Sequence, residues 1–136
     1  MDWVLDASMA LAWAFPDEKS SEADRFLGML TTESILWVPA VWWYEMANAL
    51  TTARRRQRLT EAEVIRLTEL YGILPIRTDF LLDPNAVMRF HTLAWEYNLS
   101  AYDAAYLELA QRRGLGLATL DRRLSSAAQE AGVKVF

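Results

Sequence analysis

The stretch WVLDASMALAWAF, residues 3–15, joins a short apolar strand to a short helix, and it decides which class of fold we expect. We predict a strand over residues 3–6 and a helix over residues 8–15 that stops near Pro16. A strand followed at once by a helix is the repeating unit of α/β proteins with parallel sheets. Asp6 ends this strand, so it stands at the edge where such sheets bind ligands.

The same alternation of strands and helices continues to the end of the chain. Further strands are predicted at residues 34–38, 74–77 and 115–119, and helices at residues 20–30, 41–57, 60–71, 83–97, 100–113 and 121–131. Thr60 and Glu63 form a capping box, and Gly72 is predicted to end that helix. We therefore expect one α/β domain over residues 1–136, with a mainly parallel central sheet and helices on both faces.

Composition narrows the class of protein. The chain has no cysteine, which excludes a disulfide framework and a thiolate metal site. Its formal net charge of −4 argues against a protein that coats nucleic acid by bulk electrostatic attraction. Neither a signal-peptide pattern nor an apolar run of membrane-spanning length is present, so we expect a cytoplasmic protein without membrane contact.

Four acids fall at the edge of the predicted sheet. Asp6 ends the first strand, and Asp121 follows the last one. Glu45 lies in the first turns of the helix after the second strand, and Asp103 lies in the first turn of the helix before the last strand. Each acid alone could simply cap a helix or complement its dipole. Gathered together they would repel one another unless a cation is present, and hard oxygen ligands favour Mg²⁺ or Mn²⁺.

The side chain of Asp103 is predicted to point along the apolar face of its helix, together with Tyr106, while Glu108 and Arg112 lie on the opposite, polar face. Two explanations stay open for this inward carboxylate. Either the border of the helix holds a site that needs negative charge, or Asp103 and Ser100 form a capping box.

A polar ridge on the helix at residues 41–57 runs from Glu45 towards a group of arginines. This group comprises Arg54, Arg55, Arg56 and Arg58. At a rise of about 1.5 Å per residue, Arg56 lies roughly 16 Å from Glu45, which suits a phosphodiester backbone that leaves a metal site. The simpler alternative is a solvated helix face whose positive charge compensates the helix dipole.

The absence of several motifs excludes other chemistries. His91 is the only histidine, so a ribonuclease mechanism that uses two imidazoles is excluded, and its apolar helical neighbours predict a core or subsurface position. The sequence has no G-x-S-x-G, no P-loop, no G-x-G-x-x-G and no H-E-x-x-H motif. Ser8 stands two residues after Asp6, where it is able to bind the carboxylate, to bind a metal-bound water or to cap the first helix.

Four segments together resemble the PIN-domain ribonucleases and, among them, the VapC toxins of prokaryotic toxin–antitoxin pairs. They are VLDASM, WYEMANAL, LSAYDAAYLELA and LATLDRRL, and their order and placement extend the resemblance over essentially the whole chain. The resemblance implies a single-domain PIN fold and a Mg²⁺- or Mn²⁺-dependent endoribonuclease. It also implies a homodimer, an RNA substrate, and a VapB-like antitoxin whose C-terminal segment lies in a groove near the active site.

The resemblance assigns roles to residues by motif. Asp6, Asp103 and Asp121 are expected to hold the metal, and Glu45 to orient or deprotonate the attacking water. The expected supporting residues are Ser8, Asn48 and Thr119, and the expected RNA contacts are Arg54, Arg55, Arg56, Arg58, Arg122 and Arg123. Some family members carry another acid just after the position of Asp121, where this chain has Arg122 and Arg123, so the number of metals stays open.

Two other functions stay open on the sequence. One is a non-catalytic PIN-like module that binds RNA or protein, and the other is a metal-dependent nuclease or phosphatase that acts on DNA or small phosphoesters. Trp13, Trp37 and Trp43 are candidate contacts with a second copy or an antitoxin, although core packing accounts for most tryptophans of this kind.

Overall fold

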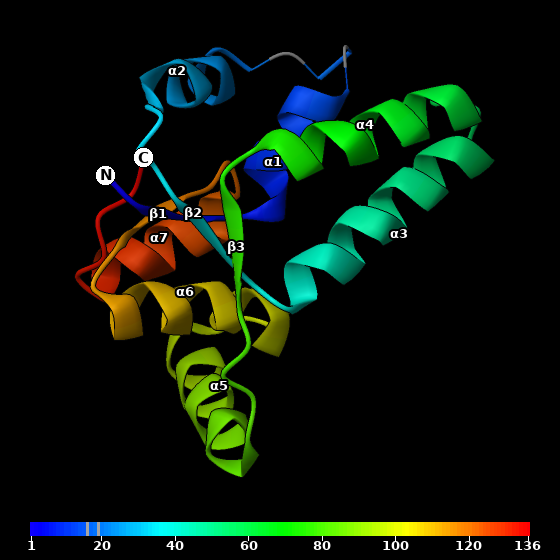
Figure 1. Ribbon diagram of the computed structural model, residues 1–136. Helices are drawn as coiled ribbons and strands as arrows, with labels where there is room; N and C mark the ends of the chain where they lie inside the picture. The colour runs from blue at the N-terminus through cyan, green and yellow to red at the C-terminus, as the bar shows by residue number, and fades with distance from the viewer. Residues whose placement is uncertain (16, 19) are drawn as a thin grey trace.

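The structure of the protein is a computed structural model that describes residues 1–15, 17–18 and 20–136 (Figure 1). The strands are β1 (Trp3–Leu5), β2 (Leu36–Pro39), β3 (Ile76–Asp79) and β4 (Gly116–Ala118). The helices are α1 (Ala7–Ala14), α2 (Ser21–Met29), α3 (Val41–Arg55), α4 (Glu61–Ile73), α5 (Pro84–Tyr97), α6 (Ala101–Arg113) and α7 (Arg122–Glu130). Pro16, where the first helix was predicted to stop, lies outside the described residues.

The four strands form one parallel sheet in the order β3-β2-β1-β4. The chain moves from β1 to one side for β2 and β3, and it returns to the other side for β4. The two sides of this reversal leave a crevice beyond the carboxyl ends of β1 and β4, which is where open α/β sheets bind ligands. The prediction of an α/β fold with a parallel central sheet is confirmed.

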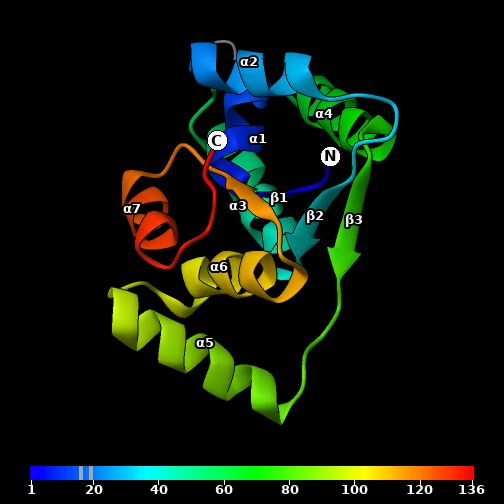
Figure 2. The same ribbon diagram turned by 90° about the vertical axis from the view of Figure 1, so that its left-hand side faces the viewer.

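Helices cover both faces of the sheet. Figures 1 and 2 show α6 against one face, with α5 outside it, while α1 and α2 lie on the opposite face. Residues 104–110 of α6 are all buried, because the helix is enclosed by the sheet on one side and by α5 on the other. The hairpin of α3 and α4 extends away from the sheet as an arm (Figure 1).

The strands are short, and β1, β2 and β4 are mostly buried, which fixes how closely the helices approach them. Val4, Leu36 and Leu117 have no exposed surface and lie in one apolar cluster. Gly116 packs against Trp3 so tightly that a Cβ atom there would lie 2.5 Å from the indole ring. The carboxyl ends of β1 and β4 are therefore held in fixed register, with Leu5 paired to Ala118.

Several local signals determine where the helices begin and end, and the predicted capping box of Thr60 and Glu63 is confirmed. Thr60 and Glu63 form the capping box at the start of α4, and Asp83 caps α5 by accepting a hydrogen bond from the backbone N–H of Ala86. Gly114 ends α6 in the left-handed conformation. The predicted helices and strands all exist, with ends that differ by one or two residues.

Two predictions were wrong. Gly72 does not end α4, which continues to Ile73; Leu74, extended before Pro75, ends it instead, because a residue before proline avoids the helical conformation. His91 is exposed rather than in or just beneath the core. The apolar residues beside it, Val87 and Met88, are exposed too, whereas Leu93 and Tyr97 of the same helix pack against the core.

The polar face predicted for α6 is only partly exposed to solvent. Glu108 is buried beneath α5, where its carboxylate accepts hydrogen bonds from Arg89 and Arg112. Arg112 and Arg113 also bind the buried Asp79 at the end of β3. Burial raises the pKa of Asp79, but the hydrogen bonds from Arg112, from the Leu81 N–H and from Arg113 outweigh it and lower the pKa to about 2. This ion-pair network locks α6 to β3 and α5.

None of the helices in the described part of the chain combines the length and the apolar character that crossing a membrane requires.

Candidate active site

Asp6 lies at the carboxyl end of β1 and is only 5% exposed. It occupies the N-cap position of α1, yet its side chain makes no capping hydrogen bond. Its Oδ2 atom instead accepts hydrogen bonds from Ser8 Oγ at 2.6 Å and from Thr119 Oγ1 at 2.7 Å. Capping therefore does not account for this carboxylate, which two hydroxyl groups hold beside the crevice.

Ser8 and Thr119 connect Asp6 to the loop after β4. Ser8 Oγ accepts a hydrogen bond from the Leu120 N–H at 2.9 Å, and Thr119 Oγ1 accepts one from the Asp121 N–H at 3.0 Å. Ser8 thus binds the carboxylate rather than capping α1, which is one of the roles expected for it. The orientation of Asp6 is fixed from both sides of the β1–β4 crevice.

Asp121 caps α7, as its helical position suggested. Its Oδ1 atom accepts a hydrogen bond from the Leu124 N–H at 2.9 Å, and the residue is exposed. The charge of Asp121 nevertheless raises the pKa of both Asp6 and Asp103, so its carboxylate lies close to theirs.

Glu45 and Asp103 approach from two helices. Glu45 is half-buried in the second turn of α3, and its Oε1 atom accepts a hydrogen bond of 2.6 Å from the hydroxyl of Tyr106. Asp103 is half-buried in the first turn of α6, where its backbone N–H donates to Ser100 Oγ at 3.1 Å. Asn48 lies one turn after Glu45 and is exposed.

The four acids Asp6, Glu45, Asp103 and Asp121 form what we call the acidic cluster, because each interacts electrostatically with at least two others. Burial is the largest cause that raises the pKa of Asp6, of Glu45 and of Asp103, and the neighbouring negative charges raise these pKa values further. Hydroxyl hydrogen bonds lower them without reversing the direction. The cluster therefore holds more negative charge than its surroundings neutralise.

The donor set of the acidic cluster fits a hard divalent cation, since it consists of carboxylate oxygens without sulfur or imidazole. Among the residues that the structure describes, Arg123 is the one cation that lowers the pKa of Asp6, Glu45 or Asp103, through its charge on Asp103. Within residues 1–15, 17–18 and 20–136, no three acidic or histidine side chains are arranged so that together they could hold a metal ion.

The arginines predicted to bind RNA differ in their surroundings. Arg58 binds Asp17 and Glu18 and stacks over the ring of Phe15. Arg54 forms an ion pair with Glu61. In the described part of the chain Arg55 and Arg56 make no ion pair, and both are exposed at the far end of the α3–α4 arm.

Arg122 and Arg123 occupy the first turn of α7 and are exposed. The charge of Arg123 reaches Asp103, so this end of α7 borders the acidic cluster. Thr119, Asp121 and Arg122 also line a surface hollow of about 490 Å³.

Two of the three candidate tryptophans are partly buried and pack against the core. Trp13 stacks on Phe26 and donates to the backbone of Ala23, and Trp37 lies beneath the guanidinium of Arg113. Trp43 is partly exposed and donates to Thr78.

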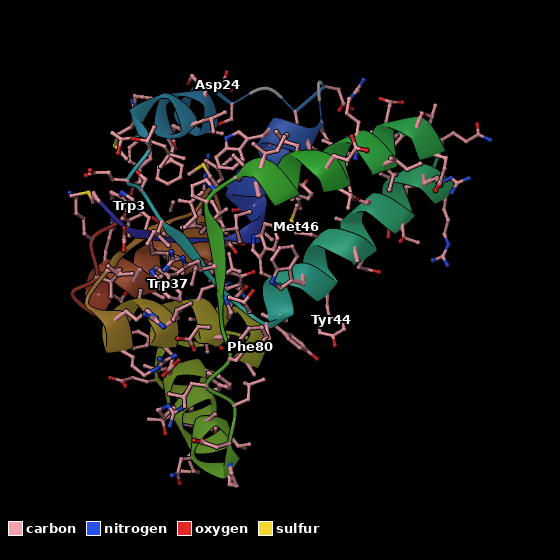
Figure 3. The ribbon with its side chains drawn as sticks, in the orientation of Figure 1. Trp3, Asp24, Trp37, Tyr44, Met46 and Phe80 are labelled. Atoms are coloured by element: carbon pink, nitrogen blue, oxygen red, sulfur yellow. The ribbon has the colours of Figure 1, made fainter. Side chains whose placement is uncertain are left out.

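The strongly exposed apolar side chains are others, which sequence analysis did not single out. Tyr44, Phe80, Leu82 and Tyr102 are exposed around or beside a pocket of about 340 Å³ between α3, α5 and α6. Figure 3 shows Tyr44 and Phe80 at the same corner of the molecule, where α3 starts and the chain leaves β3.

The sequence analysis did not predict that Tyr106 donates a hydrogen bond to Glu45 or that Asp79 accepts hydrogen bonds from Arg112 and Arg113. Tyr106 was counted only as part of the apolar face of its helix, although its spacing from Asp103 places both on one side. The sequence contained no signal that its hydroxyl would meet Glu45, which is 61 residues away.

The chain matches a known protein family and is similar in sequence to a named ribonuclease. The family model described as the PIN domain matches residues 3–130. Ribonuclease VapC3 from Pyrobaculum aerophilum is 34% identical over 131 residues, which cover 92% of this chain and 93% of the relative.

Solved structures share the fold. The crystal structure of PAE2754 from Pyrobaculum aerophilum has a TM-score of 0.71 and 26% identity, and the match covers 99% of this chain and 89% of that one. A chain in a toxin–antitoxin complex from Klebsiella pneumoniae has a TM-score of 0.60 and 18% identity, with 88% of this chain and 86% of that one covered.

Proposed function

This chain belongs to the PIN-domain family, and we propose that it is a metal-dependent endoribonuclease, the toxin of a VapBC-type toxin–antitoxin pair. The observation that carries the proposal is the acidic cluster at the carboxyl edge of the sheet, whose charge the surrounding residues do not neutralise. The similarity to ribonuclease VapC3 over almost its whole length supports RNA as the substrate.

Asp6, Asp103 and Asp121 are the residues that would hold Mg²⁺ or Mn²⁺. Ser8 and Thr119 orient Asp6 towards the site through its Oδ2 atom. When bound, the cation supplies Lewis-acid polarisation of the scissile phosphate and compensates the charge of the carboxylates.

Glu45 is proposed to accept the proton of the attacking water. Its pKa is raised, first by burial and then by the charges of Asp6 and Asp103, which brings a carboxylate closer to the pKa of an effective base at neutral pH. Attack of the water oxygen on phosphorus breaks the bond to the 3′ oxygen, so the products carry a 5′-phosphate and a 3′-hydroxyl.

The RNA backbone is proposed to leave the site in two directions. Arg55 and Arg56 lie along α3 beyond Glu45, and Arg122 and Arg123 border the cluster on α7. Arg54 and Arg58 belong to the same group, but each must exchange an acidic partner for phosphate. Asn48 lies between Glu45 and the arginines and is proposed as a supporting contact.

The proposed partners are a VapB-like antitoxin and a second copy of the chain. The similarity to VapC3 and the occurrence of the same fold in a toxin–antitoxin complex support the antitoxin. The exposed apolar side chains around the 340 Å³ pocket are the surface that a second copy would cover. A ribonuclease with such an antitoxin acts where cellular RNA is, so we place it in the cytoplasm.

The decisive experiment compares the wild type with Asp103→Asn on a labelled RNA of mixed sequence. The wild type is expected to cut after Mn²⁺ or Mg²⁺ is added and to stop in EDTA, whereas Asp103→Asn cuts ~10²-fold more slowly or less while its circular dichroism is unchanged. Binding of RNA without any cleavage would make the chain a binding module. Faster turnover of DNA or of a simple phosphodiester would identify another kind of hydrolase.

A further inference from the structure

Tyr106 is a fully buried tyrosine whose hydroxyl contacts a member of the acidic cluster. Its side chain is 0% exposed, in the middle of α6. A buried tyrosine hydroxyl usually has a hydrogen-bond partner, and the partner here is Glu45 Oε1 at 2.6 Å. This length is typical of a short hydrogen bond from a hydroxyl to an ionised carboxylate.

The contact joins two helices that approach the cluster separately. Glu45 is carried by α3, whereas Tyr106 follows Asp103 by about one turn of α6. The packing of α6 against the sheet therefore fixes Asp103 directly and fixes the Glu45 carboxylate through the phenol.

We propose that Tyr106 is a positioning residue for Glu45, an inference that rests on the proposed ribonuclease function. The hydrogen bond occupies Oε1, which leaves Oε2 of Glu45 to face the attacking water. The terminal torsion of a glutamate is otherwise broad, so without the phenol the carboxylate would sample orientations in which neither oxygen reaches that water.

The surroundings of the phenol keep it a donor. Burial raises the pKa of Tyr106, and the negative charges of Asp6 and Glu45 raise it further. The hydroxyl therefore stays protonated while Glu45 is ionised, which is the combination that the contact requires.

The chain offers a matched control in Tyr71. Its ring is also buried, but its hydroxyl has no hydrogen-bond partner in the described residues. Tyr71→Phe and Tyr106→Phe therefore remove the same atom from two buried sites, of which only one touches the acidic cluster.

The test measures kcat and KM on an RNA oligonucleotide, and Mn²⁺ affinity by calorimetry, for the wild type and both phenylalanine variants. Tyr106→Phe is expected to lower kcat by ~10-fold or more while KM and Mn²⁺ affinity stay within about twofold, because the phenol orients the base without holding the cation. Tyr71→Phe is expected to keep the wild-type kcat.

A double-mutant cycle with Glu45→Gln separates positioning from a general structural effect. If Tyr106 acts through Glu45, adding Tyr106→Phe to Glu45→Gln changes the residual rate by less than about twofold. An equal loss of rate in both backgrounds, or a loss of Mn²⁺ affinity that accounts for the lower rate, overturns the inference.

The remaining outcomes separate this inference from the proposed function. An active wild type with an unimpaired Tyr106→Phe variant overturns the positioning role alone. A wild-type chain that cuts no RNA with either cation overturns the proposed function and the inference with it.

Discussion

Asp6→Asn is expected to make the protein more stable at neutral pH while it removes ribonuclease activity. Asn has the shape of the protonated acid, and its carbonyl oxygen accepts the hydrogen bonds from Ser8 and Thr119 that Oδ2 accepts now. What the substitution removes is a charge in a site that is 5% exposed and that feels the negative charge of Asp121.

The direction of the pH dependence follows from the raised pKa of Asp6, which burial causes first. The folded protein holds the proton of Asp6 more tightly than the unfolded chain does, so ionisation costs stability as pH rises above the ordinary value of 3.8. The cost is complete once pH exceeds the folded-state pKa. At pH 7 we expect Asn to add about 1–2 kcal/mol, which is the usual size of the penalty for a buried polar group whose hydrogen bonds compensate its lost hydration incompletely.

Thermal unfolding of the cation-free protein between pH 3.5 and 8 measures this effect. For a chain of this length, about 1–2 kcal/mol corresponds to a rise in Tm of roughly 3–8 °C at pH 7. The difference should shrink as pH falls towards 3.8. Asp24→Asn, an exposed change on α2 labelled in Figure 3, should stay within about 0.5 kcal/mol of the wild type.

With Mn²⁺ added, the wild type should be more stable than Asp6→Asn, because the cation binds the folded wild type and compensates the charge of Asp6. The variant lacks this charge. The reasoning is refuted if Asp6→Asn is less stable than the wild type at pH 7 without cation. It is refuted equally if its advantage grows as pH falls, since that would make the ionised Asp6 a stabilising group.

Two further predictions concern charges outside the acidic cluster. Asp79→Asn should lower the free energy of unfolding by about 2–3 kcal/mol at pH 7, because the pKa of Asp79 is lowered from 3.8 to about 2. The ionised carboxylate stabilises the fold above pH 4, and this stabilisation is lost as pH falls through 2. Urea unfolding at pH 7 and pH 2.5 measures the loss, and equal effects of the substitution at both pH values would contradict the prediction. Arg55→Ala with Arg56→Ala should weaken RNA binding and lower the slope of log K against log salt by about 0.7 per lost phosphate contact. Arg58→Ala should change that slope less because its guanidinium binds Asp17 and Glu18, and fluorescence anisotropy over a salt series compares them.

The alternation of strands and helices was enough to predict where the acids of the cluster fall in the fold. In a parallel sheet every strand ends at the same edge, so Asp6 and Asp121 were placed there by chain order alone. The hydroxyl of Ser8 on Asp6 was also within reach of sequence reasoning, because the two residues are neighbours in the chain.

Contacts between segments that are far apart in the chain could not be predicted from the sequence. The face of α5 that carries His91 has the apolar spacing of a buried face, but Leu93 and Tyr97 pack against the core instead and Trp95 is 83% exposed. Glu108 had the spacing of a surface residue, yet α5 and Arg112 enclose it. Periodicity shows that a face is apolar or polar, but it does not show which face the neighbouring helix covers.

The buried acids of this chain fall into two kinds, which their partners distinguish. Asp79 and Glu108 accept hydrogen bonds from guanidinium groups, which cancel their charge within the fold. Asp6 accepts them from the hydroxyls of Ser8 and Thr119, and Glu45 accepts one from a phenol, so these neutral donors orient the two charges without cancelling them. A buried carboxylate whose donors are all neutral keeps its charge and destabilises the fold, whereas a paired arginine would compensate that charge. A bound cation would compensate it as well. This difference supports the proposal that the acidic cluster binds a cation, whereas the acids paired with arginine stabilise the fold.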